Sequence, residues 1–129
     1  GTLNGQAFEW VADADPRLGP VCECFIDGQY YWVPFDRIAR IELPEPDDVL
    51  DTVWASAQIE FTTGGTKHVL MPVRYPGTES SQDDDLLFAR KTVWDGNDDT
   101  GWKGMGQRVW TTDSSELGML DVRELILQA

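Results

Sequence analysis

The chain is poor in the side chains from which catalytic and zinc centres are built. It contains one histidine, His68, and two cysteines, Cys22 and Cys24, among 129 residues. Nucleophilic hydrolysis needs a base beside the nucleophile, and a zinc site needs a cluster of histidine and cysteine ligands. We therefore expect no metal, no cofactor and no catalysis by histidine. His68 is predicted on a strand surface, and both cysteines as buried free thiols.

Basic residues are also scarce. The chain has 10 Lys and Arg against 23 Asp and Glu, a net charge of −13. Nucleic acids and anionic membranes bind clustered Lys and Arg, so neither is expected as a partner. Most of the excess lies in three runs without a basic residue: Glu45, Asp47, Asp48 and Asp51; Glu79, Asp83, Asp84 and Asp85; Asp95, Asp98 and Asp99. We expect these runs to lie in loops and to aid solubility. The alternative is that they bind a basic protein partner.

Long apolar segments are absent too. No run approaches the roughly 18 residues of a membrane span, and the first residues show no secretory signal. The length and the 41% of apolar residues fit one globular domain. We expect a single cytoplasmic domain over residues 1–129, without membrane insertion.

Short alternating segments separated by turn residues predict strands. The Asp27-Gly28 pair predicts a tight type I′ hairpin, because that turn needs positive φ at both central residues. A second turn is predicted at 63–66. Strands are predicted at 8–12, 21–26, 29–33, 40–43, 54–62, 67–71, 92–94 and 107–111. The alternation at 54–62 predicts one buried face.

Helical signals are few. Residues 35–38 and 83–89 predict short helices, and Asp113-Ser-Ser-Glu116 fits a capping box that starts another. Residues 95–106 predict a long loop, and 119–127 fit strand and helix equally. The sequence therefore predicts an α+β, β-rich fold, with a small, strongly curved antiparallel sheet or partly open barrel and two or three short helices.

Asp13 and Asp15 form the most suggestive acidic pair, because two carboxylates can share acid–base work. Arg17 follows them and favours ionised, salt-bridged carboxylates, so we interpret the three as a structural loop clamp. The alternative is a small carboxylate-based enzyme or ligand-binding domain that uses Asp13 and Asp15. That alternative requires a deep pocket and raised carboxyl pKa values.

Two aromatic segments are candidates for protein contact. In a strand, Tyr30 and Trp32 face one side and Tyr31 the other, so one face is core and the other is available for recognition. Trp102 lies among glycines, and it either contacts a partner or folds back onto the core.

Several segments resemble one family. They are 8–20, beginning Phe-Glu-Trp-Val-Ala-Asp-Ala-Asp-Pro-Arg; 28–38; 72–77; 86–94; 104–107; and 112–113 with 120–124. Together they resemble the ImpE/TagJ family of accessory proteins of bacterial type VI secretion systems. The resemblance implies a C-terminal β-rich domain without the family's TPR-like helical N-terminal region. It also implies an adaptor role and no catalytic residues.

The resemblance further implies protein partners. The family is similar in role to an adaptor that binds the small sheath subunit TssB and is linked to the ClpV ATPase, mostly through the helical region. Homo-oligomers are possible. The candidate partner-binding residues are Arg17, Arg37, Arg74, Tyr75, Trp102 and Arg123. Arginines beside strand ends can instead satisfy carbonyls or carboxylates. The leading hypothesis is a non-enzymatic interaction module; a domain that only stabilises the helical region or a dimer is a further alternative.

Overall fold

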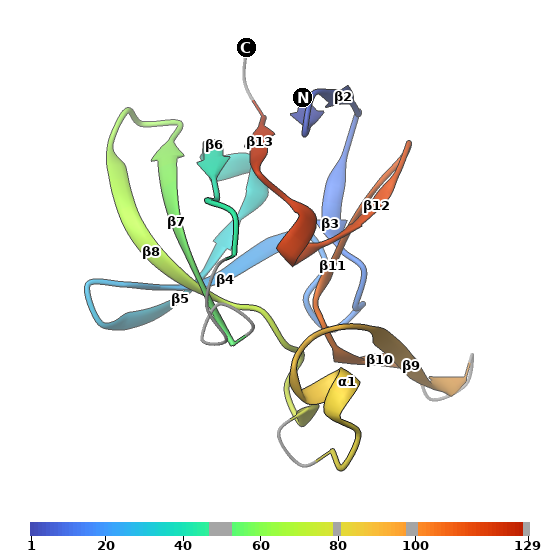
Figure 1. The fold of residues 1–129 in the computed structure, drawn as a ribbon. Coiled ribbons are helices and arrows are strands. Elements are labelled where there is room, and N and C mark those ends of the chain that lie inside the picture. The colour runs from blue at the N-terminus through green and yellow to red at the C-terminus, as the bar shows by residue number, and fades with distance from the viewer. Residues whose placement is uncertain (47–52, 79–80, 98–100, 128–129) are drawn as a thin grey trace.

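The largest element of the fold is an eight-stranded antiparallel sheet (Figure 1). The computed structural model describes residues 1–46, 53–78, 81–97 and 101–127. The strands lie in the order β2 (Gln6–Ala7), β1 (Thr2–Leu3), β13 (Glu124–Ile126), β6 (Ile38–Glu42), β7 (Trp54–Phe61), β8 (Thr66–Pro72), β4 (Val21–Ile26) and β5 (Gln29–Pro34). Because β1 pairs with β13, the two ends of the chain meet in one sheet.

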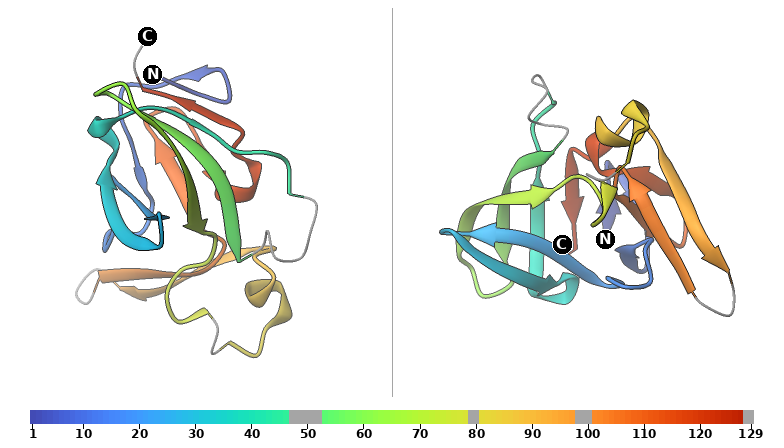
Figure 2. Two further views of the ribbon diagram at one scale, coloured as in Figure 1. Left: turned by 90° about the vertical axis from the view of Figure 1, so that its left-hand side faces the viewer. Right: turned by 90° about the horizontal axis from the view of Figure 1, so that it is seen from below.

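Two smaller sheets and a short helix complete the fold. The three-stranded sheet contains β3 (Val11–Asp13), β11 (Val109–Thr112) and β12 (Glu116–Gly118); the hairpin contains β9 (Thr92–Asn97) and β10 (Gly101–Gly106). Asp83 caps the helix α1 (Asp84–Leu87), as its side chain accepts a hydrogen bond from the N–H of Asp85. The views in Figure 2 show α1 and the β9–β10 hairpin together at one end of the molecule.

Alternation along the strands places the core on one face of the large sheet. On β7 the side chains of Ala55, Ala57 and Ile59 are buried, which confirms the single buried face predicted there. Val69 and Met71 of β8 are buried on the same side. The intervening residues of β7 and β8 are mostly exposed, so the opposite face of these two strands is open to solvent.

The Asp27-Gly28 hairpin is confirmed. Their φ angles are 51° and 79°, and Ile26 pairs with Gln29 across a two-residue turn. The predicted strand at 21–26 coincides with β4. Local turn chemistry was therefore enough to define this part of the sheet.

The predicted α+β class with two or three short helices is wrong. Among the described residues, α1 is the only α-helix, and it has four residues. Phe35–Arg37 and Met119–Asp121 form short 3-10 turns, η1 and η4. The large sheet is curved, but in the described residues it ends at β2 and β5 and does not close into a barrel. The fold is β-rich, with an open antiparallel sheet as its main element.

The capping-box prediction is wrong because the polar side chains at 112–116 serve a turn between strands. The N–H groups of Ser114 and Ser115 donate to Thr112 Oγ1, and the N–H of Thr112 donates to the Ser115 carbonyl. Asp113 accepts a hydrogen bond from the N–H of Glu9 and caps no helix. These bonds turn the chain from β11 into β12.

The predicted loop at 95–106 is wrong at both ends of its range, because residues 95–97 belong to β9 and residues 101–106 form β10. Glycine ordinarily weakens a strand, which is why the glycines here favour a loop. A Cβ on Gly104 would lie 2.5 Å from the Tyr75 ring, and one on Gly106 would overlap the Lys91 carbonyl. The glycines therefore mark close contact of β10 with neighbouring chain.

Candidate protein-interaction surface

A buried polar network surrounds the acidic pair singled out in the sequence. Asp13 is 5% exposed and Asp15 is fully buried. Asp13 Oδ1 accepts hydrogen bonds from the N–H of Asp15 at 2.9 Å and from the hydroxyl of Tyr75 at 2.7 Å. Asp15 Oδ2 accepts from Arg17 Nη2 at 2.6 Å and from the N–H of Gly104 at 2.9 Å. The network ties the loop after β3 to the segment after β8 and to β10.

The two carboxyl groups have pKa values shifted in opposite directions. Burial raises the pKa of Asp13 from 3.8 to about 6, although hydrogen bonds from Asp15 and Tyr75 oppose it. Burial acts on Asp15 as well, but hydrogen bonds from Arg17 and Gly104 outweigh it and hold its pKa below the usual value. Burial, followed by the charge of Asp13, raises the pKa of Tyr75 well above its ordinary 10, so its hydroxyl remains a donor.

This arrangement favours the loop clamp over the acid–base alternative. Asp13 has the raised pKa that an enzyme would require, but its carboxylate is enclosed by protein. Every buried side-chain nitrogen or oxygen in the described residues has a hydrogen-bond partner. Within the same ranges, no three His, Cys, Asp or Glu side chains are grouped so as to hold a metal ion.

A second buried ion pair was missed by the sequence reasoning. Arg108 Nη2 lies 3.1 Å from Glu23 Oε1, and both side chains are almost fully buried. Arg108 Nε donates to the Arg74 carbonyl at 2.9 Å, and the guanidinium lies 5.4 Å from the centre of the Tyr75 ring. Arg108 is two positions before the buried Trp110. Strand alternation from Trp110 was therefore the signal that could have placed Arg108 inside.

The outer surface of the large sheet carries a set of neighbouring large apolar side chains. Phe25 lies across from Tyr30 and from Leu70 on adjacent strands. Its ring centre is 5.2 Å from that of Tyr30 and 5.3 Å from that of Trp54. Trp32 extends the set along β5, and its Nε1 donates to the Tyr30 hydroxyl. We call Phe25, Tyr30, Trp32, Trp54 and Leu70 the aromatic face; exposed apolar groups of this kind mark interaction sites.

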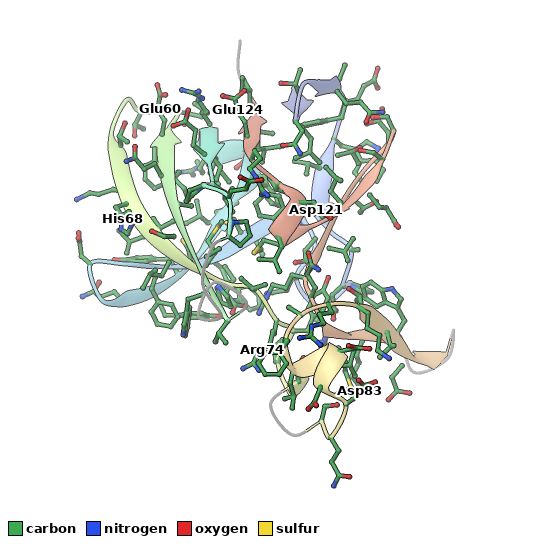
Figure 3. The ribbon with its side chains drawn as sticks, viewed as in Figure 1. Glu60, His68, Arg74, Asp83, Asp121 and Glu124 are labelled. Atoms are coloured by element: carbon green, nitrogen blue, oxygen red, sulfur yellow. The ribbon has the colours of Figure 1, made fainter. Side chains whose placement is uncertain are left out.

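Two shallow hollows adjoin the aromatic face, and both are lined by Phe25 and Trp54. One, of about 510 Å³, reaches His68 on β8. The other, of about 270 Å³, reaches Arg74 and the Arg108 side chain. His68 lines only the first of these hollows and Arg74 only the second, and Figure 3 shows the two residues apart, His68 on β8 and Arg74 near α1. Hollows lined by aromatic rings accept apolar side chains of a binding partner.

The structure brings two of the predicted contact residues, Arg74 and Tyr75, to the margin of the aromatic face. Arg74 Nη1 donates to the Leu87 carbonyl at 3.1 Å, and Tyr75 is buried. Arg17 is partly exposed but pairs with Asp15. All three side chains therefore have partners within the fold, and Arg74 satisfies a backbone carbonyl as the alternative interpretation of the strand-end arginines proposed.

The other predicted contact residues lie elsewhere. Arg37 is exposed at the end of η1, and Arg123 Nη1 donates to the carbonyls of Leu120 and Val122. Figure 3 shows Arg74 beside α1, away from the segment between Asp121 and Glu124 that contains Arg123. The arginines do not converge on one patch. The side chain of Trp102 lies outside the described residues, as do most residues of the acidic runs.

The single histidine and the cysteines have the environments predicted for them. Cys22 and Cys24 are buried and free, with Cys22 Sγ 3.4 Å from Met71 Sδ. His68 is exposed on β8 and is hydrogen-bonded to Ser56. None of the described helices is long and apolar enough to cross a membrane.

The fold defines a small β-rich domain with an open sheet, and comparison with known proteins identifies its family. The chain belongs to the ImpE family, whose model, described as ImpE protein, matches residues 5–126. This confirms the resemblance drawn from the sequence segments.

Two relatives extend the comparison. The chain is 38% identical over 125 residues to the type VI secretion system accessory component TagJ of Pseudomonas aeruginosa, covering 97% of this chain and 43% of that protein. It also matches the crystal structure of protein VPA1032 from Vibrio parahaemolyticus. That match has a TM-score of 0.81 and 26% identity, and covers 98% of this chain and 48% of that one. The chain spans less than half the length of either relative.

Proposed function

We propose that this chain is an accessory domain of a bacterial type VI secretion system that acts by binding other proteins and not by catalysis. Membership of the ImpE family and the similarity to TagJ, a type VI secretion accessory component, support the secretion role. The aromatic face is the observation that supports a binding role.

The aromatic face has the composition expected of a contact surface. Tryptophan and tyrosine are enriched among residues that dominate binding energy at protein interfaces. Trp54 and Leu70 remain well exposed although apolar side chains of their size are commonly buried. The catalytic alternative lacks such support, because Asp13 and Asp15 are engaged with other parts of the fold.

The partners we propose are the small sheath subunit TssB and the ClpV ATPase, with the cytoplasm as the site of action. The family resemblance supports both partners, and the acidic composition favours a partner with basic segments. In relatives more than twice as long as this chain, other parts of the protein can share these contacts. The contribution of the aromatic face is therefore what a binding experiment must isolate.

The test is a binding assay between the purified chain and purified TssB, with two matched tryptophan variants. Trp54 in the aromatic face is 40% exposed, and Trp10, outside it, is 51% exposed. We expect Trp54→Ala to weaken binding at least tenfold, because it removes a wall of both hollows, and Trp10→Ala to leave binding unchanged. Equal binding by both variants, or no binding by the unaltered chain, would contradict the proposal.

A further inference from the structure

β5 forms one edge of the large sheet. Among the described residues it pairs only with β4. The tight turn makes Ile26 and Gln29 a hydrogen-bonded pair, and bonded and non-bonded pairs alternate from there along the hairpin. The N–H and C=O groups of Tyr30 and Trp32 consequently point away from β4. No other described residue forms a backbone hydrogen bond with them.

This edge lacks the features that normally protect a sheet from further pairing. Natural edge strands are short, charged, bulged or covered. β5 has six residues, Gln-Tyr-Tyr-Trp-Val-Pro, with no charge and with proline only at the last position. Its register with β4 is unbroken. The opposite edge strand, β2, has two residues. The sequence thus leaves one edge long and open and keeps the other short.

The side chains along β5 are suited to a neighbouring strand. Tyr30, Tyr31 and Trp32 are 50%, 43% and 53% exposed. Tyr31 shares the core-facing side with the buried Cys24 and is exposed because the sheet ends there. A strand beside β5 would place alternate side chains against Tyr30 and Trp32 on one face and against Tyr31 on the other. Pairs of aromatic residues with aromatic or β-branched residues stabilise such contacts.

We propose that β5 accepts an extended segment of a partner protein as an additional antiparallel strand of the large sheet. The inference rests on the proposed function and specifies how the partner is held. The segment carries β-branched or aromatic residues at alternate positions and basic residues at its ends. Basic ends follow from charge, since Asp36 is exposed just beyond one end of β5 and Asp27, which pairs with Lys67, is exposed beyond the other, in a chain of net charge −13. The same charge disfavours a second copy as the occupant.

The test uses a synthetic peptide, acetyl-Lys-Thr-Val-Thr-Val-Thr-Lys-amide, and amide hydrogen exchange of the chain followed by NMR. We expect the peptide to slow exchange at Tyr30 and Trp32 at least tenfold, because their N–H groups become bonded. A control peptide, N-methylated at every Thr and Val, lacks donors along the strand and carries methyl groups that prevent close approach to β5, so it cannot pair and should leave exchange unchanged. Unaltered exchange at Tyr30 with millimolar unmethylated peptide would overturn the proposal.

Two variants separate backbone pairing from side-chain contact. Trp32→Pro removes an outward N–H and no bond to β4, so the chain should stay folded and lose the peptide effect. Trp32→Ala removes the ring but keeps the N–H, so exchange at Tyr30 should still slow. Protected amides at Cys24 and Tyr31 verify that the hairpin of each variant is intact. If Trp32→Pro disrupts the hairpin, the comparison of the methylated with the unmethylated peptide alone decides whether the segment pairs through its backbone.

Two other results would also overturn strand addition by a partner. One is retained peptide binding by a folded Trp32→Pro variant, which would place the contact on side chains. The other is slowed exchange at Tyr30 that depends on chain concentration without peptide, which would make a second copy the occupant. The assay contains no secretion component, so its failure leaves the TssB experiment to decide the proposed function independently.

Discussion

Replacing Asp13 by asparagine should stabilise the chain at neutral pH. Asp13 is almost fully buried, and its Oδ1 accepts hydrogen bonds from the Asp15 N–H and the Tyr75 hydroxyl. Asparagine keeps an oxygen that can accept both bonds and carries no charge. The variant therefore removes the unfavourable burial of an ionised carboxylate with little change in geometry.

The size and sign of the effect of Asp13 on the free energy of unfolding follow from its raised pKa. The pKa of Asp13 is about 6 in the folded chain, against 3.8 as the ordinary value. Between those pH values the folded chain binds a proton that the unfolded chain has lost, so the free energy of unfolding rises as the pH falls from about 7 towards 4. Across this pH range, the raised pKa of Asp13 changes the free energy of unfolding by roughly 3 kcal/mol. Asp15 has a lowered pKa, and its stabilising contribution is lost only below about pH 4.

The assay is urea unfolding followed by tryptophan fluorescence between about pH 4 and pH 8. An amide nitrogen in place of Oδ2 costs about 1 kcal/mol if it finds no acceptor. We therefore expect Asp13→Asn to raise the free energy of unfolding by about 2 kcal/mol at pH 8 and to give no such gain near pH 4. The stability curves of the variant and of the unaltered chain should cross between these pH values. Asp36→Asn, at an exposed aspartate, should follow the unaltered chain. Parallel curves for Asp13→Asn and the unaltered chain would refute the reasoning.

Three further variants test the same fold. Tyr75→Phe leaves the Val109 N–H without its hydroxyl acceptor and removes one of the two donors to Asp13; we expect a loss of about 1–3 kcal/mol in urea unfolding and a steeper pH dependence. Arg108→Met leaves a buried carboxylate at Glu23 and should cost about 3–5 kcal/mol, part of which the added Glu23→Gln should restore. Gly28→Ala should cost about 1 kcal/mol in the same assay, because its φ is 79°.

Sequence patterns correctly predicted the elements that are determined by residues close together in the sequence. The Asp27-Gly28 turn and the alternation of β7 needed no distant contact, and both were found as expected. One predicted helix was wrong because Asp113 accepts a hydrogen bond from the N–H of Glu9, more than a hundred residues away, and so does not start a helix. β10 was missed because Gly104 and Gly106 are explained only by the Tyr75 ring and the Lys91 carbonyl beside them.

The candidate surface was predicted in part for the same reason. Tyr30 and Trp32 were placed on one strand face from their spacing alone. Trp54 and Leu70 join them only because β8 lies between β7 and β4, an order that no local pattern contains. The Arg108–Glu23 pair spans 85 positions of sequence, so no local pattern could identify Glu23 as the partner of Arg108.

Gly104 offers a direct test of how firmly the β9–β10 hairpin is joined to the rest of the fold. A Cβ there would lie 2.5 Å from two carbons of the Tyr75 ring and 3.0 Å from Trp94. The ring cannot retreat easily, because its hydroxyl is bonded to Asp13 and its face is packed by Arg108. We therefore expect Gly104→Ala to cost about 2–3 kcal/mol of unfolding free energy in urea.

The matched control is Gly65→Ala, since a Cβ at that position meets nothing within 4 Å. It should change stability by less than about 0.5 kcal/mol. Gly104→Ala should also shift the near-ultraviolet circular dichroism, because the Tyr75 and Trp94 rings, with centres 5.7 Å apart, must move. If Gly104→Ala proves as stable as the control with an unchanged spectrum, the Tyr75 ring is not fixed, and Asp13 and Asp15 do not hold the hairpin in place.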